Sequence, residues 1–369
     1  MQVYLFMILW IALVGFMSKT YEVTELIDGR EEKRCNYTYS ILMFAVIIFF
    51  TGLRSSVGDT FNYINNFNNI DVESTSLLSI LKNSDGYQLY NAYGYIVKKY
   101  VSEDSRVYLF GIALISGIFT MIGYRRLSCN YTFSLILFML SGKFVWMMNG
   151  IKQFAAAALM LMAFKLITAE EGRYKYFVYL FIAYLIHPSA IVILPAYFIF
   201  KGKPWSAKIL VTIGLAILAI TFVSEFTNFL DFATEDTVFD GSVKQFSNDD
   251  GSNIMRFFVA AVPPALALLK RKEVEKINSP TINVMINMSV LSACCYLVAT
   301  FTSGILMGRV PLYFELTNFA LLPWLLENVF EAKDRKIFKI ACIVCYCVFF
   351  YFQVWGLEYT SYTLNLYLY

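Results

Sequence analysis

The sequence predicts an all-α membrane protein, and two properties support this fold class. Of its 369 residues, 58% are hydrophobic and only 15% are charged, and the mean hydropathy is +0.58. Soluble domains carry more charged and fewer apolar residues. Long apolar runs also recur along the whole chain, and a transmembrane helix needs about 20 such residues, or fewer when it tilts or its polar ends reach the interface.

The apolar runs predict a polytopic protein with about twelve transmembrane helices, forming a single transmembrane domain over residues 1–369. Pro188 splits the weakest pair of spans, so this pair is alternatively a hairpin that enters and leaves on one side. The first run lacks a basic start and a clear cleavage site, which favours a retained helix over a signal peptide. The expected spans are 2–17, 38–53, 106–123, 131–148, 150–168, 174–187, 188–200, 206–223, 254–269, 281–301, 309–326 and 337–355.

The distribution of Lys and Arg predicts that both ends of this chain lie on the outer side. With that orientation, about twenty of the 30 Lys and Arg residues fall on inner connections, where positive charge is favoured. Two long outer loops result. Residues 54–105 place Tyr, Leu, Ile and Val at helix-like intervals, which predicts amphipathic helices on the membrane surface. Residues 224–253 form an acidic outer loop.

Composition excludes several function classes. The net charge of +3 is small and scattered, and no nucleic-acid motif interrupts the apolar runs, so no nucleic-acid partner is expected. Three of the seven cysteines, Cys342, Cys345 and Cys347, lie in an apolar segment and are interpreted as ordinary membrane-helix residues. A single histidine excludes a multi-His metal site, and no metal or cofactor is expected. No internal repeat indicates an inverted-repeat transporter.

Five cations lie at outer ends of the predicted spans, where positive charge is disfavoured. A charge at membrane depth costs roughly 2.5 to 3.5 kcal/mol on insertion scales and usually faces a cavity or a partner. Each cation alone is explained by a side chain that snorkels to the interface or by an ion pair. Five cations on one face of the membrane favour a shared anionic ligand, such as a phosphate or pyrophosphate. A passively bound anionic lipid headgroup is the alternative. The five are Arg54, Lys143, Lys152, Arg256 and Arg309.

Two further segments carry candidate residues. His187, in "AYLIHPSAIVILP", is the only histidine, and imidazole titrates near neutral pH, which suits proton transfer. The alternative is a histidine that is hydrogen-bonded inside the bundle. In "NGIKQFAAAALML", Asn149 and Gly150 predict a turn, and Lys152 and Gln153 open the next helix. The alanines that follow allow close helix packing.

The motifs together resemble the EpsG family, the Wzy-type polymerases of bacterial capsular and exopolysaccharides. The ordered set is "LRSSVGDTFNYINNF", "NGIKQFAAAALML", "YLIHPSAIVILP" and "GRVPLYF", which spreads over residues 51–315. The resemblance implies a GT-C-like helical bundle. It also gives functional weight to Arg54, Gly58, Asp59, Tyr63, Gln153, His187, Ser189 and Arg309. One position departs from the family pattern, since the usual arginine of "I-R-Q" is Lys152 here, which keeps the charge but loses bidentate phosphate recognition.

The resemblance implies a metal-independent membrane glycosyltransferase in the bacterial inner membrane, with its active site facing outward. The donor is then a glycan on undecaprenyl pyrophosphate, and the acceptor is the non-reducing-end hydroxyl of another lipid-linked repeat unit. Undecaprenyl pyrophosphate leaves when the glycosidic bond forms. Membrane lipids, a chain-length regulator and a flippase are the further partners expected.

We hypothesise that the cations hold the pyrophosphate and that His187 or Asp59 serves the attacking hydroxyl. Asp59 is alternatively a residue that only orients Arg54. The pyrophosphate-binding set is Arg54, Lys152, Arg256 and Arg309, the last also counted as catalytic. The expected substrate contacts are Gly58, Tyr63, Asn149, Gln153 and Ser189. Two other functions are considered: a flippase for lipid-linked oligosaccharide, which needs polar residues deeper in the spans, and a glycan acyltransferase with His187 as base.

Overall fold

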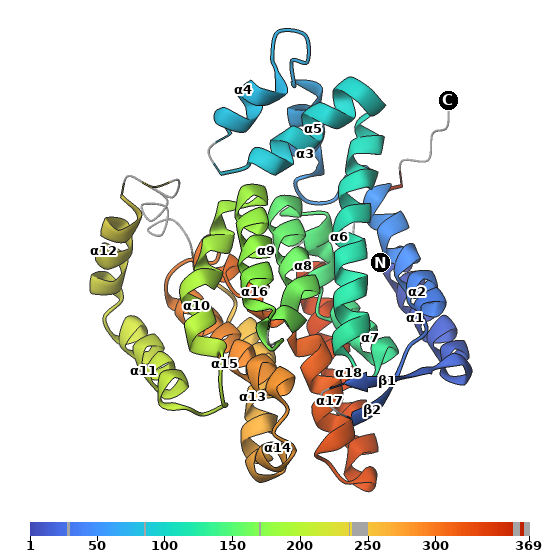
Figure 1. The fold of residues 1–369 in the computed structure, drawn as a ribbon, viewed down its shortest axis with the longest axis vertical. Coiled ribbons are helices and arrows are strands. Elements are labelled where there is room, and N and C mark those ends of the chain that lie inside the picture. Colours follow the sequence, from blue (N-terminus) through green and yellow to red (C-terminus); the bar gives the residue numbers. More distant parts are fainter. Residues whose placement is uncertain are drawn as a thin grey trace.

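The apolar runs of the sequence form helices, because a helix satisfies its own backbone hydrogen bonds without water. The computed structural model describes residues 1–27, 30–84, 86–169, 171–235, 237, 250–356 and 362–364. Within these ranges the fold is a helical bundle with one two-stranded sheet (Figure 1). The predicted all-α class is therefore confirmed in its main feature.

Four described helices are long and apolar enough to cross a membrane. They are α1 with its 3-10 extension (Gln2–Tyr21), α6 (Ser105–Leu127), α15 (Pro280–Phe301) and most of α18 (Ala332–Gly356). A fifth span results if α11 (Ala207–Thr221) and α12 (Val223–Thr234), which meet at 106°, count as one. The expected number of about twelve is not confirmed.

Several expected spans correspond to shorter helices. These are α2 (Tyr37–Gly52), α7 (Tyr131–Leu140), α8 (Ile151–Ala163), α9 (Arg173–Ile186), α10 (Ile193–Phe200), α13 (Ile254–Leu269), α16 (Leu312–Glu315) and α17 (Asn318–Asn328). Short 3-10 segments extend some of them, among them η3 (Lys143–Met147), η4 (Phe164–Ile167), η5 (Pro188–Val192) and η7 (Met307–Arg309).

Two glycines interrupt the apolar run between residues 131 and 168. α7 ends just before Gly142, whose φ is +74°, and α8 begins after Gly150, whose φ is +82°. A left-handed backbone stops a helix, and only glycine adopts it without a steric cost. The break at Gly150 agrees with the turn predicted at Asn149 and Gly150, whereas the break at Gly142 falls inside the expected span 131–148, because hydropathy does not detect a single left-handed glycine.

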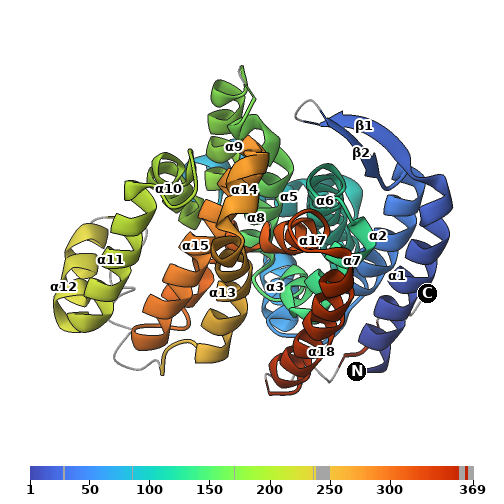
Figure 2. The same cartoon turned by 90° about the horizontal axis from the view of Figure 1, so that it is seen from below.

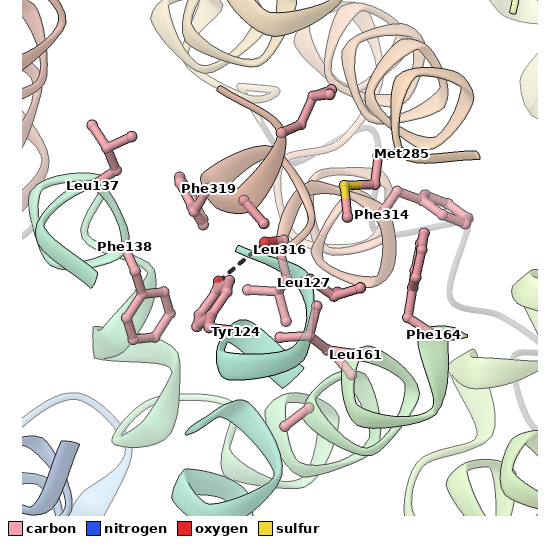
Figure 3. Close-up of a cluster of buried hydrophobic side chains, with 14 of the residues drawn as sticks. Tyr124, Leu127, Leu137, Phe138, Leu161, Phe164, Met285, Phe314, Leu316 and Phe319 are labelled. Carbon is pink, nitrogen blue, oxygen red and sulfur yellow. Dashed lines mark hydrogen bonds between the residues drawn. The ribbon is translucent and has the colours of Figure 1, made fainter. Parts of the chain in front are cut away.

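The core lies where α6, α7, α8 and α17 meet. Figure 3 shows Tyr124 of α6 among buried apolar side chains, and its hydroxyl donates to the carbonyl of Leu316 at 3.1 Å. The alanine run 155–158 of α8 is entirely buried. Small side chains let helices approach closely. Gly123 of α6 shows this contact, because a Cβ there would lie 2.7 Å from Cγ of Leu161.

One end of the bundle, hereafter the hairpin end, carries the sheet and the short helix α14 (Arg271–Ile277) (Figure 1). Strands β1 (Val23–Ile27) and β2 (Arg30–Arg34) pair antiparallel, with Val23 opposite Arg34. Figure 2 shows this hairpin beside α2 and α6. Arg125 of α6 fixes it there through a two-pronged ion pair with Glu25.

The opposite end, hereafter the cap end, is covered by three short helices that form the cap (Figure 1). They are α3 (Thr60–Asn68), α4 (Leu77–Lys82) and α5 (Gln88–Ile96), and a π-helical turn, η2 (Val97–Val101), leads from α5 towards α6. Phe67 and Tyr90 of the cap are buried with Tyr108 of α6, and the two tyrosine hydroxyls share a hydrogen bond. The cap therefore occupies the segment 54–105.

Of the predicted acidic loop 224–253, the first part is helical and belongs to α12. Residue 236 and residues 238–249 lie outside the described residues. Whether this loop covers an outward cavity therefore stays a prediction.

Candidate functional site

Segments that are far apart in the sequence meet at the connection between η3 and α8, residues 146–153, hereafter the 146–153 turn. Gly150 gives this turn its left-handed bend, and a Cβ there would lie 2.7 Å from the ring of Trp146. The backbone N–H of Gly150 donates to the hydroxyl of Tyr63 at 3.0 Å. The turn is thus fixed from the cap side, where α3 carries Tyr63.

Arg54 is buried at the cap end, and its guanidinium is bound by the protein itself. Nε donates to Oγ1 of Thr60 at 2.9 Å, and the two Nη atoms donate to the carbonyls of Thr51 at 2.5 Å and Met148 at 3.1 Å. The residue is only 1% exposed. Burial lowers the pKa of the Arg54 guanidinium to about 10, so it stays charged at neutral pH. Arg54 thereby ties the end of α2 to the 146–153 turn.

Residues 362–364 pack against the loop between α2 and α3, residues 53–59, hereafter the Arg54 loop. The backbone N–H of Ser55 donates to the carbonyl of Thr363 at 3.0 Å, and Leu364 forms an isolated antiparallel bridge with Arg54. The hydroxyl of Tyr362 donates to the carbonyl of Phe50 at 2.6 Å. The loop is therefore held between two segments that are distant in sequence.

Gly58 and Asp59 contact the 146–153 turn through Asn149. Gly58 has φ +53°, and a Cβ there would lie 2.8 Å from the side chain of Asn149, so only glycine fits. The backbone N–H of Asp59 donates to Oδ1 of Asn149 at 3.2 Å. The Asp59 side chain is exposed and, within the described residues, forms no ion pair with Arg54 or any other cation.

Lys152 lies in the first turn of α8, below the cap, and is half-buried. Its Nζ is 4.6 Å from the ring centroid of Tyr87 and 4.7 Å from that of Tyr90. Cation–π contacts of this kind orient an ammonium group but leave its charge unneutralised. In the part of the chain that the structure describes, no carboxylate pairs with Lys152.

Gln153 connects three of the predicted residues. Its Nε2 donates to Oγ of Ser189 at 3.3 Å and to the backbone carbonyl of Arg309 at 3.1 Å. Ser189 Oγ lies 2.7 Å from Nδ1 of His187 and 2.8 Å from the hydroxyl of Tyr313. A hydrogen-bonded chain thus joins α8, the break after α9 and the segment before α16.

The hydrogen bonds of His187 indicate which ring nitrogen is free to bind a ligand. The backbone N–H of Ser189 donates to Nδ1 at 3.3 Å, so Nδ1 presents its lone pair. The proton of the neutral imidazole therefore sits on Nε2, which is a donor. The ring meets that of Tyr87 edge-on at 5.4 Å, and both Lys152 and Arg309 act on it electrostatically.

Arg309 ends the 3-10 segment η7 and is exposed. Its guanidinium carbon lies 6.0 Å from the ring centroid of Trp146. Burial raises the pKa of Tyr87, and the positive charge of Arg309 opposes this shift. Among the described residues no carboxylate forms an ion pair with Arg309.

A small pocket of about 50 Å³ lies next to Trp146 and Asn149, and we call it the Arg256 pocket. Arg256 and Lys143 also line it. Nε of Arg256 donates to Oε1 of Gln353 at 3.3 Å, so its charge is oriented but not neutralised.

Lys143 differs from the other predicted outer cations because it has a carboxylate partner. Its Nζ lies 2.6 Å from Oε1 of Glu315, and the hydroxyl of Tyr296 contacts both groups, accepting from Nζ at 2.6 Å and donating to Oε1 at 2.9 Å. All three residues are buried. The interpretation of Lys143 as an anion-binding cation is therefore replaced by a buried ion pair.

A comparison with known families decides the classification. Residues 37–368 match the model of the EpsG family, which is nearly the whole chain. The chain belongs to the EpsG family. No curated protein and no solved structure matches it significantly. EpsG membership, together with the apolar helices, supports a membrane protein of polysaccharide biosynthesis.

The EpsG motif residues, although spread along the chain, are neighbours in space around the 146–153 turn. The residues brought together are Arg54, Gly58, Asp59, Tyr63, Asn149, Lys152, Gln153, His187, Ser189 and Arg309. Arg256 approaches the same turn through its pocket. Arg54 is buried, and among the described residues its side chain forms no hydrogen bond or ion pair with that of Asp59.

Sequence reasoning missed Trp146, Tyr313 and Glu315. Tyr313 lies one helical turn after Arg309 within "GRVPLYF", a spacing that puts both on one face. Glu315 is a carboxylate in an apolar run, and such residues usually have a partner in the bundle. Trp146 carried no comparable signal in the sequence.

Proposed function

We propose that this protein is a polysaccharide polymerase that transfers an undecaprenyl-pyrophosphate-linked glycan onto the non-reducing end of another lipid-linked repeat unit. One observation carries the proposal: Lys152, which lies over the Tyr87 ring that His187 contacts, and Arg309, which lies over Trp146, have no carboxylate partner among the described residues. Unneutralised cations around one site favour an anionic ligand, and a pyrophosphate is the anion that the family's role in polysaccharide biosynthesis suggests.

In the proposed reaction, the acceptor hydroxyl oxygen attacks the anomeric carbon of the donor glycan. The new glycosidic C–O bond forms while the bond from that carbon to the pyrophosphate oxygen breaks. The electron pair leaves with undecaprenyl pyrophosphate, and the hydroxyl proton passes to a base. The enzyme therefore has to stabilise negative charge on the leaving group and to receive one proton.

Lys152 and Arg309 are the proposed pyrophosphate ligands. The exposed Arg309 guanidinium offers a planar fork, whereas Lys152 contributes a point charge held over two tyrosine rings. Arg256 extends the positive surface on the far side of Trp146. Because Arg54 is 1% exposed and each of its three guanidinium nitrogens donates to the protein, we assign it a positioning role at the 146–153 turn instead of a direct contact.

The proton is assigned from the hydrogen bonds of the two candidate bases. Nδ1 of His187 accepts from Ser189, so the free ring nitrogen carries a proton and is suited to donate to a pyrophosphate oxygen. The exposed Asp59 carboxylate has no ion-pair partner among the described residues. We therefore propose Asp59 as the base and His187 as a hydrogen-bond donor to the leaving group.

The decisive test uses the purified full-length chain in liposomes, with its lipid-linked repeat unit as the only substrate. A ladder of longer lipid-linked glycans is expected, with the active site facing the outer side of the bacterial inner membrane. Movement of the lipid between leaflets without any chain growth would instead establish a flippase and refute the polymerase.

A further inference from the structure

The cap lines a pocket of about 400 Å³, which is larger than the Arg256 pocket and shares no lining residue with it. This cap pocket lies among α3, α4, α5 and the start of α6. Its volume falls in the range typical of small-molecule sites, roughly 300 to 1,000 Å³. Apart from Lys152, the polymerase mechanism described above assigns no role to the residues that line this pocket.

Amides and hydroxyls dominate the polar lining of the cap pocket. Asn66 and Asn91 line it, and within the described residues their side-chain amides have no hydrogen-bond partner. Nearby, Nδ2 of Asn83 donates to Oγ of Ser79 at 3.3 Å. A primary amide offers two donors and an acceptor that accepts twice, so this lining can bind groups that both donate and accept.

Aromatic rings form the apolar part of the same wall. Phe67 and Tyr108 stack with ring centroids 4.6 Å apart, and Tyr90 is linked to Tyr108 through its hydroxyl. A ligand for this wall has both an apolar face and many hydroxyls. A sugar ring has this combination, because its C–H groups form a flat face and its hydroxyls lie around the rim.

The charge of the cap pocket argues against a phosphate. Its lining has one cation, Lys152, and one carboxylate, Asp71. Oδ1 of Asp71 accepts from the backbone N–H groups of Glu73 and Ser74 at 3.0 Å, which keeps the carboxylate ionised in the wall. These hydrogen bonds lower the pKa of Asp71, with the Ser74 hydroxyl as the largest cause. A nearly neutral polar ligand is therefore favoured over an anion.

Lys152 connects the cap pocket to the proposed reaction site. It lines the pocket, and its Nζ also lies over the ring of Tyr87, which His187 contacts edge-on. We infer that the cap pocket is a saccharide subsite, which binds neutral sugar units of the glycan next to its reacting end. This inference rests on the proposed polymerase function for the identity of the glycan, and Asn66 and Asn91 are its specificity-determining residues.

The test measures sugar binding directly, without catalysis. The probe is the repeat-unit oligosaccharide freed from its lipid pyrophosphate by mild acid, titrated onto the full-length protein in nanodiscs and followed by saturation-transfer NMR. We expect Asn66→Ala and Asn91→Ala each to raise Kd by roughly fivefold, and together by about 25-fold, since each removes hydrogen bonds to the ligand. Asn62→Ala is the matched control, because Asn62 is exposed on the same helix and outside the pocket lining.

Two results would overturn the subsite: no oligosaccharide binding by the wild type, or the same Kd in the double variant. Binding of undecaprenyl pyrophosphate, whose proposed ligands are Lys152 and Arg309, reports whether each variant is folded. We expect this binding to be unchanged in both variants. If the double variant does not fold, Asn66→Ala alone decides, because this residue is exposed on a helix surface. A wild type that binds the oligosaccharide but builds no ladder would refute the polymerase and leave the subsite intact.

Discussion

The two ends of the bundle treat their charged residues differently. At the hairpin end, several cations lie against carboxylates: Arg125 pairs with Glu25, Arg271 with Glu275, and both Arg335 and Lys339 with Glu327. At the cap end, Lys152 and Arg309 lie over aromatic rings, and Arg256 is hydrogen-bonded to an amide. The pairs Lys143–Glu315 and Arg106–Asp104 are the exceptions there.

This difference shows where a ligand is expected. Cations that have carboxylate partners stabilise the fold, and their charge is not available to a ligand. The hairpin end carries many of the Lys and Arg residues that the positive-inside rule assigns to inner connections. A cation packed on a ring keeps its charge available, because a ring orients the charge without cancelling it. The cap end therefore combines two unneutralised cations, one unpaired carboxylate and one histidine around a single turn of the chain.

The largest effect is expected for the unpaired carboxylate. Asp59→Asn removes the proposed base while keeping the side-chain shape, so chain growth should fall by about 10²- to 10⁴-fold. The measurement is the initial rate of ladder formation in liposomes. His187→Gln should lose less, since glutamine still donates a hydrogen bond. If His187→Gln is the more damaging change, the assignment of base and donor has to be reversed.

The second-largest loss of chain growth is expected for Arg309→Ala, which removes one of the two unneutralised cations of the cap end. Without the guanidinium the leaving pyrophosphate loses a charged donor, and chain growth should fall by about 10²- to 10³-fold at unchanged expression. Arg309→Lys should recover part of the rate. Full activity of the alanine variant would show that the free cation at the cap end is not a ligand.

A smaller loss of chain growth is expected when Lys152, the second unneutralised cation of the cap end, is replaced. Lys152→Met should slow chain growth by roughly 10- to 100-fold, because one charged hydrogen bond is lost. Lys152→Arg should grow chains at least as fast as wild type, since a guanidinium also stacks on Tyr87 and Tyr90. Rates of both variants at saturating substrate test this, and a loss in the arginine variant would contradict the proposed phosphate contact.

The smallest effect is expected at the hairpin end. The side chains of Arg271 and Glu275 are 53% and 50% exposed, so their ion pair contributes little to stability. Arg271→Ala should leave both chain growth and the thermal unfolding temperature within error of wild type. A loss of activity comparable to that of Arg309→Ala would remove the distinction between the two ends.

The sequence predicted the helical class and the EpsG family because both depend on local patterns. Apolar runs mark helices wherever they occur, and the motifs are read in order along the chain. The expected span 131–148 was predicted too long, since its helix ends just before the left-handed Gly142, whereas the turn at Gly150 was predicted. Hydropathy averages over single glycines and does not detect such breaks.

The site was predicted by residue type but not by role. Arg54 has the features of a ligand in the sequence, yet its acceptors include a carbonyl at Met148, 94 positions away, which no local pattern indicates. Lys143 has the same limitation, because its partner Glu315 lies in a different helix. Burial and partners arise from tertiary packing, whereas the convergence of the motifs on one turn followed from the family resemblance.

The contact between the Arg54 loop and residues 362–364 has a consequence for biogenesis. Ser55 is bound by Thr363, 308 positions later, so this wall of the site is completed only after nearly all other helices have been synthesised. Contacts of such long sequence separation form late in folding. A partly inserted nascent chain would therefore expose cations without a finished site, and the protein would become competent to bind its lipid substrate only at the last step of its own assembly.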